Sequence, residues 1–159
     1  MITIYTDGAS RGNPGPGGWG GIIASEDWVL EIGGRDSHTT NNKMELTACI
    51  RSLEFTISNS QFSNQPIQIY TDSEYVSKGM TEWIHRWQKK NWKTAGKKPV
   101  LNQDLWQKLL ELSGGRKVEW KYVAGHAGIP LNERADEIAT TFADDFTPVL
   151  YNGPKDKYK

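Results

Sequence analysis

The sequence predicts an α/β fold in which helices flank a mixed five-stranded sheet. Residues 2–6 and 67–71 alternate with a period of two and are rich in β-branched and aromatic residues, which is typical of strands. A stretch with helical apolar spacing separates them, and a strand, helix and strand in succession form a right-handed crossover with parallel strands. Residues 19–24 and 28–32 predict two more strands, which form an antiparallel meander with the first strand at one edge.

The remaining elements follow in order along the chain. The Gly- and Pro-rich stretch 8–18 predicts a loop, and 25–27 predicts a hairpin turn. Asn41 and Asn42 suit the N-cap of a helix whose apolar positions recur at helical spacing as far as Ile57. The same criteria predict helices over 73–79, 81–90, 102–112 and 131–142, a basic loop over 91–100, and a last strand over 117–123 that pairs in parallel.

The composition favours a cytoplasmic protein without a membrane segment. The N-terminus enters a predicted strand directly, and the 36% of hydrophobic residues form short segments, none near the roughly 18–20 residues of a membrane helix. The single cysteine, Cys49, excludes an intrachain disulfide and has the spacing of a buried helix residue. We expect one domain over 1–144, a loosely attached tail over 145–159, and a monomer with no obligate protein partner.

Positive charge concentrates in one segment although the formal net charge is zero. A zero sum argues against a generally basic nucleic-acid binder. Residues 78–98 nevertheless hold a single acid, Glu82, so the balancing acids lie elsewhere, and a local positive lobe beside a separate acidic site fits both facts. The basic residues of the segment are Lys78, Arg86, Lys89, Lys90, Lys93, Lys97 and Lys98.

Two aspartates end two nearly identical predicted strands. Residues 2–7 and 67–72 differ at one position in six, and Asp7 and Asp72 close them. On adjacent strands the two backbones lie about 5 Å apart. A single aspartate in this position is more often a turn or cap residue, but the repeat favours a shared site. Crowded carboxylates repel one another and select hard cations such as Mg²⁺ or Mn²⁺, which predicts a metal-assisted phosphodiesterase.

Five separated motifs closely resemble, in order and spacing, those of bacterial type 1 ribonucleases H over roughly residues 2–143. The resemblance implies a ribonuclease H-like fold and an endonuclease that hydrolyses the RNA strand of RNA–DNA hybrids with two Mg²⁺ ions, for which Mn²⁺ can substitute. The products would carry 5′-phosphate and 3′-hydroxyl ends. The motifs are Thr6-Asp7-Gly8, Gly12 to Gly18, Thr39 to Leu46, Thr71-Asp72-Ser73 with Tyr75-Val76, and Gly125 to Gly128 with Asn132 to Asp136.

The resemblance also implies roles for individual residues. Asp7, Glu45, Asp72 and Asp136 would be the catalytic metal ligands, and His126 would assist proton transfer or product departure. From the pattern alone, Glu45 is as well explained as a solvated helix residue, and Asp136 has Glu133 and Glu137 as equal candidates. The assignment of these two residues therefore depends on the resemblance.

Further residues are implied to hold the hybrid. Asn13, Asn41 and Asn42 would contact the RNA strand and Thr40 a DNA phosphate. A basic protrusion over 81–99 would grip the DNA strand. The spacing of Trp83 and Trp87 on a helix favours packing of this lobe on the core over stacking on nucleic acid, and both roles can hold in part. The proposed contacts of the protrusion are Trp83, Lys89, Lys90, Trp92, Lys93, Lys97 and Lys98.

One position departs from the family pattern. Glu74 occupies a place where the family usually has glutamine, and an ionised carboxylate adds negative charge there and donates no hydrogen bond. Two other function classes remain open, a hybrid-binding module without catalysis and a transposase-like or junction-resolving nuclease. The full set of carboxylates disfavours the first, and the basic protrusion with its asparagine partners disfavours the second.

Overall fold

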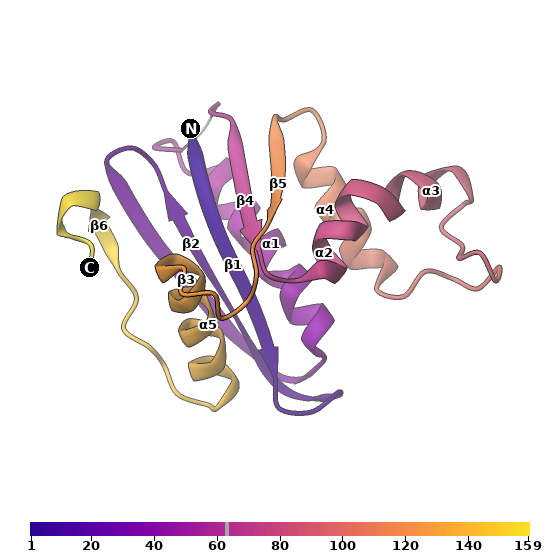
Figure 1. The fold of residues 1–159 in the computed structure, drawn as a ribbon, viewed down its shortest axis with the longest axis horizontal. Coiled ribbons are helices and arrows are strands. Elements are labelled where there is room, and N and C mark those ends of the chain that lie inside the picture. Colours follow the sequence, from indigo (N-terminus) through magenta and orange to yellow (C-terminus); the bar gives the residue numbers. More distant parts are fainter. Residues whose placement is uncertain (63) are drawn as a thin grey trace.

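A six-stranded mixed sheet forms the centre of the molecule (Figure 1). The computed structural model describes residues 1–62 and 64–159. The strand order is β5-β4-β1-β2-β3-β6. The strands are β1 Ile2–Ser10, β2 Gly15–Ala24, β3 Trp28–Thr39, β4 Ile67–Thr71, β5 Val118–Tyr122 and β6 Asn152–Pro154.

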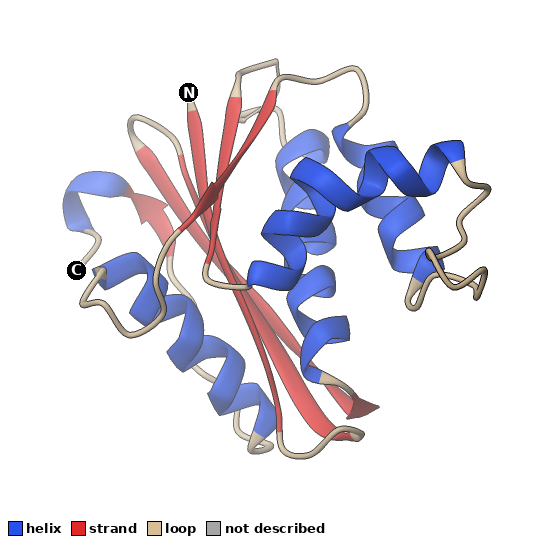
Figure 2. Ribbon diagram, turned by 45° about the vertical axis from the view of Figure 1, so that its right-hand side comes forward, coloured by secondary structure: helices blue, strands red, loops and turns tan. Residues whose placement is uncertain are grey.

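Helices cover both faces of the sheet (Figure 2). One hydrophobic cluster joins Ile4 and Ile69 of the sheet to Leu53 of the first helix, and a second joins Ile22 to Ile138 of the last helix. The helices are α1 Asn41–Ser58, α2 Glu74–Lys78, α3 Ile84–Lys89, α4 Gln103–Ser113 and α5 Pro130–Ala143. Within the described part of the chain, no helix has the length and apolar character needed to cross a membrane.

The predicted parallel core and the meander are confirmed. Strand β1 pairs in parallel with β4, and β4 with β5, while β1, β2 and β3 pair antiparallel. In the β1–β4 pair, Thr6 lies opposite Thr71. Asp7 and Asp72 therefore lie at the same level on adjacent strands, as the repeated pattern predicted. The prediction that both aspartates close their strands holds for Asp72 only, because β1 continues past Asp7 to Ser10.

The expectations of five strands and a loosely attached tail were wrong. The tail adds β6 antiparallel to β3, with Val29 opposite Gly153, and the indole N–H of Trp28 donates to Asn152 Oδ1 over 2.7 Å. A three-residue strand of Asn, Gly and Pro has no hydrophobic alternation to reveal it. It pairs with the open edge of β3, and this edge exists only once the sheet has formed, so the local sequence does not predict it.

The glycine-rich stretch is mostly strand, which corrects the prediction of a loop over 8–18. Strand β1 continues to Ser10 and β2 begins at Gly15. The glycines of β2 let α5 approach the sheet closely, because a Cβ at Gly18 would lie 2.2 Å from the carbonyl oxygen of Ala139. In β2, glycine is therefore needed for the packing of α5 on the sheet and not for a turn.

The two short helices predicted over 73–79 and 81–90 form one continuous helical segment. A π-helical turn, Gly79–Trp83, links α2 to α3. Gly79 sits against the indole of Trp106, where a Cβ would lie 2.0 Å from the ring. The ring centroids of Trp87 and Trp106 lie 5.2 Å apart, and Trp106 is fully buried. This packing supports the interpretation that the tryptophans attach the basic lobe to the core.

Candidate active site

Three carboxylates converge at the carboxyl ends of the parallel strands. Asp7 lies near the end of β1, Asp72 directly follows β4, and Glu45 lies in the second turn of α1. One carboxylate oxygen from each lies within 4.8 Å of the others. Gly8 makes this meeting possible, because a Cβ there would lie 2.3 Å from the backbone nitrogen of Glu45.

The cluster is electrostatically crowded. Burial raises the pKa of Asp7, and the charges of Glu45 and Asp72 raise it further. Burial and the charge of Asp72 likewise raise the pKa of Glu45. None of the ion pairs in residues 1–62 and 64–159 includes these three carboxylates.

The residues present fit a divalent cation. Glu45 Oε1 is buried and has no hydrogen-bond partner among the described residues. The backbone N–H of Gly8 donates to Asp7 Oδ1 over 2.9 Å and fixes the orientation of that carboxylate. A hard-oxygen donor set with one unsatisfied buried oxygen and no protein cation is the arrangement that a divalent metal neutralises.

Asp136 borders the cluster from the other side of the sheet. It lies on α5, and a hydrogen bond with Asp136 contributes to the raised pKa of Asp7. It is not one of the three residues whose oxygens lie within 4.8 Å of one another. Asp136 is therefore linked to the cluster by its interaction with Asp7. The alternative candidates, Glu133 and Glu137, are both exposed.

His126 lies in the exposed loop between β5 and α5. Its backbone is left-handed, with φ of 57°. The preceding residue, Gly125, passes beside the metal cluster, because a Cβ there would lie 3.1 Å from Asp72 Oδ2. The loop thus brings His126 to the neighbourhood of Asp72 without burying its imidazole.

The predicted RNA-facing asparagines meet beside the N-terminus of α1. Asn13 Oδ1 accepts hydrogen bonds from the Asn41 backbone N–H over 2.9 Å and from Ser10 Oγ over 3.0 Å. Asn13, Thr40, Asn41 and Asn42 line one cavity of about 870 Å³. Thr40, and not the predicted Asn41 or Asn42, caps α1, because its Oγ accepts from the Lys43 N–H over 3.2 Å.

The protrusion extends away from the sheet beyond α2 (Figure 1), and its predicted lysines are exposed. Trp83 and Trp92 are half-buried, with Trp92 against Trp87 at a centroid distance of 6.1 Å. Glu74 is exposed, and its carboxylate lies 3.6 Å from Lys78 Nζ. The exposed lysines are Lys89, Lys90, Lys93, Lys97 and Lys98.

Comparison with known proteins settles the family. The sequence model of the RNase H family matches residues 1–144. The chain belongs to the ribonuclease H family. Ribonuclease H from Cyanothece sp. is 53% identical over 148 residues, covering 92% of this chain and 92% of that protein. Ribonuclease HI from Caulobacter vibrioides is 51% identical over 140 residues, covering 87% and 89%. The resemblance to bacterial type 1 ribonucleases H is confirmed, and the chain is a ribonuclease H enzyme.

Solved structures agree with this ribonuclease H fold. LC9-RNase H1, described as a type 1 RNase H with the type 2 active-site motif, is 31% identical and superposes with a TM-score of 0.81 over 96% of this chain and 77% of that chain. LC11-RNase H1, solved in complex with an RNA/DNA hybrid, is 28% identical with a TM-score of 0.68, covering 91% and 98%.

The cavity beside the N-terminus of α1 is also lined by a residue that the sequence analysis did not single out. Asn102 lines the same cavity as Thr40 and Asn41, and its side-chain amide donates to Tyr75 Oη over 3.2 Å. It stands at the start of a predicted helix, where asparagine is an ordinary cap. Its side chain makes no cap hydrogen bond, and its φ of 59° is left-handed. The sequence contained no signal that separated it from a capping residue.

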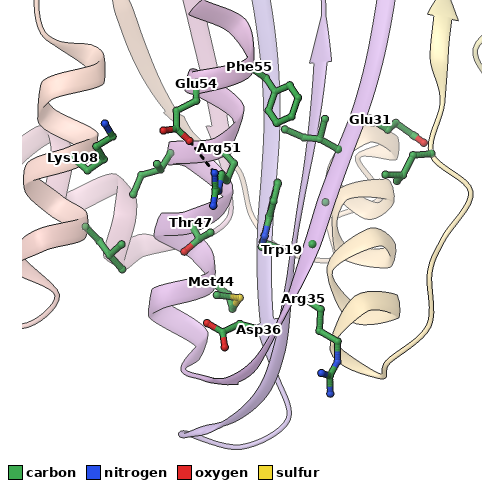
Figure 3. Close-up of a pocket in the computed structure, with 16 residues that line it drawn as sticks. Trp19, Glu31, Arg35, Asp36, Met44, Thr47, Arg51, Glu54, Phe55 and Lys108 are labelled. Carbon is green, nitrogen blue, oxygen red and sulfur yellow. Dashed lines mark hydrogen bonds and ion pairs between the residues drawn. The ribbon is translucent and has the colours of Figure 1, made fainter. Parts of the chain in front are cut away.

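A second cavity, of about 810 Å³, lies between α1 and β3 (Figure 3). Arg51 and Glu54 pair across 3.5 Å on its α1 wall, and Trp19 lines its floor. Its charged residues balance, with three acids and three bases, and none of the predicted site residues of this ribonuclease H lines it. The carboxylate cluster and not this cavity is therefore the candidate active site.

Proposed function

We propose that this ribonuclease H cuts the RNA strand of RNA–DNA hybrids with Asp7, Glu45, Asp72 and Asp136 as ligands for two Mg²⁺ ions, for which Mn²⁺ can substitute. The observation that carries the proposal is the meeting of three carboxylates within 4.8 Å with no protein cation beside them. Divalent ions bound there supply an activated water and stabilise charge on the leaving 3′ oxygen.

The ligands differ in rigidity. Asp7 and Glu45 are 4% and 6% exposed, so packing fixes their positions before substrate arrives. Asp72 and Asp136 are half-buried and form the open side of the cluster. This arrangement leaves one side of the site free for a phosphate of the RNA backbone.

His126 is proposed to exchange a proton with the leaving oxygen. Imidazole accepts and donates protons in the physiological range, and an exposed loop position allows it to reach the substrate and withdraw. The closeness of Gly125 to Asp72 supports this role, because it places the loop at the rim of the cluster.

Hydrogen bonds within the protein leave suitable donors free for the hybrid. Asn13 uses its carbonyl oxygen for Ser10 and Asn41, so its NH₂ group is available for a ribose hydroxyl. Thr40 uses its oxygen as an acceptor in the cap, so its O–H can donate to a DNA phosphate. The N-terminus of α1 favours the same negative charge.

The lysines of the protrusion are proposed to hold the DNA strand without reading its sequence. They are exposed and lie on one lobe, and phosphate contacts of this kind weaken steeply as salt rises. Trp83 and Trp92 were predicted as contacts of the hybrid, and their contacts with other aromatic rings favour a role in packing the lobe.

The test is cleavage of an end-labelled hybrid beside duplex RNA and duplex DNA, with Mg²⁺ and with chelator. Cutting of only the hybrid's RNA strand, dependent on metal and leaving 5′-phosphate ends, is the expected result. Glu45→Gln should abolish cutting, whereas Glu54→Gln, the same change at an ion-paired residue of α1 that lines the second cavity, should not. Tight hybrid binding by the wild type with no cutting under Mg²⁺ or Mn²⁺ would indicate a binding module instead.

A further inference from the structure

The C-terminal tail ends in a hydrogen-bond network around a buried acid. Glu31 of β3 is 4% exposed, and its carboxylate forms a bidentate pair with Arg134, over 2.8 and 2.9 Å. Tyr158 Oη donates to Glu31 Oε2 over 2.6 Å, and the Tyr151 N–H donates to Oε1 over 2.9 Å. Figure 3 shows Glu31 reaching from β3 toward the C-terminal segment.

The tail is held at several further points. The backbone N–H of Glu31 donates to the Tyr151 carbonyl over 2.8 Å, and Arg134 donates to the Val149 carbonyl over 2.8 Å. The rings of Tyr151 and Tyr158 pack with centroids 5.1 Å apart. The tail therefore joins the sheet edge at β3 to helix α5, beside which it runs in Figure 1.

Helix α5 packs on the sheet through both hydrophobic side chains and glycines. Ile138 of the helix joins a hydrophobic cluster with Ile22 of the sheet, and a Cβ at Gly20 would lie 2.7 Å from the Ala135 carbonyl. Such close packing sets the distance between helix and sheet. Polar contacts near the helix ends add a directional constraint on the position of the helix along the sheet.

Two such contacts lie on either side of Asp136 along α5. Arg134 holds the N-terminal half through Glu31, and Asp144, just after the helix, pairs with Arg11 in a bidentate contact over 2.7 and 2.8 Å. Residues 134 and 136 point about 200° apart around the helix. One of them faces the tail, and the other faces Asp7.

We propose that Glu31 and Tyr158 are positioning residues for metal binding, which act by fixing the axial position of α5 and so the distance from Asp136 to Asp7. The inference rests on the proposed function, in which Asp136 is a metal ligand. Neither residue touches substrate in this arrangement, and both act through Arg134.

The experiment compares three full-length variants with the wild type and with Asp136→Asn. Tyr158→Phe removes one hydroxyl and keeps the ring that packs on Tyr151. Glu31→Gln removes the charge that Arg134 pairs with, and Phe62→Leu is a control for general destabilisation, since Phe62 lies in the core cluster that α1 covers. Mg²⁺ binding to the free enzyme, hybrid cleavage against Mg²⁺ concentration, and Tm are measured for each protein.

We expect Tyr158→Phe and Glu31→Gln to raise the half-saturating Mg²⁺ concentration roughly tenfold, the scale of losses at supporting residues of metal sites. The KM for hybrid should stay unchanged, and kcat at limiting Mg²⁺ should fall. Phe62→Leu should lower Tm without moving the Mg²⁺ dependence. Should Glu31→Gln fail to fold, Tyr158→Phe alone decides.

Two results would overturn the inference. The first is a lowered Tm in the tail variants with an unchanged Mg²⁺ dependence, which would reduce the network to a structural role. The second is an equal shift in Phe62→Leu. If Asp136→Asn abolishes cleavage in either case, the proposed function stands. If Asp136→Asn cleaves and binds Mg²⁺ like the wild type, the assignment of Asp136 fails and the positioning role fails with it.

Discussion

Two buried acids, Glu31 in strand β3 and Glu45 in helix α1, illustrate opposite ways of keeping a carboxylate out of water. Glu31 receives a guanidinium, a hydroxyl and a backbone N–H, so the protein satisfies its charge. Glu45 has an oxygen without a hydrogen-bond partner in the described part of the chain, and two more carboxylates face it. Burial of a charge is costly unless it is paired. The charge of the first acid is therefore neutralised within the protein, whereas the second requires a cation from solution.

The sharpest test of this difference is Asp72→Asn. Loss of one metal ligand should lower single-turnover cleavage on the order of a thousandfold, because charge stabilisation by bound metal is worth several kcal/mol. Thermal unfolding should stay the same or shift upward, since the substitution removes a repelling charge. Full retained cleavage would refute the assignment of Asp72.

The reverse pattern is expected when Glu31 loses its partner. Arg134→Met should cost about 3 kcal/mol of unfolding free energy, because it leaves a buried acid without its cation. Urea unfolding measures this loss. A variant as stable as the wild type would show that the two tyrosine contacts alone satisfy Glu31.

Mg²⁺ should stabilise the protein through the cluster alone. At a concentration of about 100 times Kd, a ligand that binds only the folded state adds roughly 2.7 kcal/mol. Thermal unfolding with and without Mg²⁺ should show this gain in the wild type and in the control Glu54→Gln, but a much smaller gain in Asp7→Asn. An equal gain in all three proteins would place the bound cation elsewhere.

A smaller effect distinguishes the two acids by pH. Although burial acts to raise it, hydrogen bonds from Arg134, Tyr158 and Tyr151 hold the pKa of Glu31 below its ordinary value of 4.5. The stability that Glu31 contributes is thus present above pH 4.5 and is lost as pH falls through its lower folded value. Urea unfolding from pH 6 to the acid limit should show a shallower loss in Tyr158→Phe than in the wild type. Parallel curves would mean that Tyr158 does not contribute to the shift.

The sequence predicted the sheet and the cluster for one reason. The two copies of the repeat that ends in Asp7 and Asp72 each have the periodicity of a strand, and these two strands pair with each other. The contact between the two aspartates could therefore be predicted from two short sequence segments. The positions of Glu45 and Asp136 needed the family motifs, because a carboxylate on a helix shoulder has many neighbours with the same pattern. The structure explains Glu45 through Gly8, whose missing side chain admits α1.

The features that were missed depend on contacts between distant segments. Strand β6 is visible only once β3 offers an edge, and the tail network joins residues 31, 134 and 158. The strand residues among 8–18 appeared as a loop because glycine is read as a turn former, whereas here it admits a helix. Asn102 resembled a cap and lines the cavity instead.

The glycines beneath α5 have a consequence for mutational scanning. Any side chain at Gly18 would meet the backbone of α5, although Gly18 itself has no side chain that takes part in the chemistry proposed. In a library of random variants this position should be depleted almost as strongly as the metal ligands. Positions intolerant to mutation would therefore include both the catalytic centre and the glycines on which α5 packs. Only assays that measure folding separately from cleavage would distinguish the two groups.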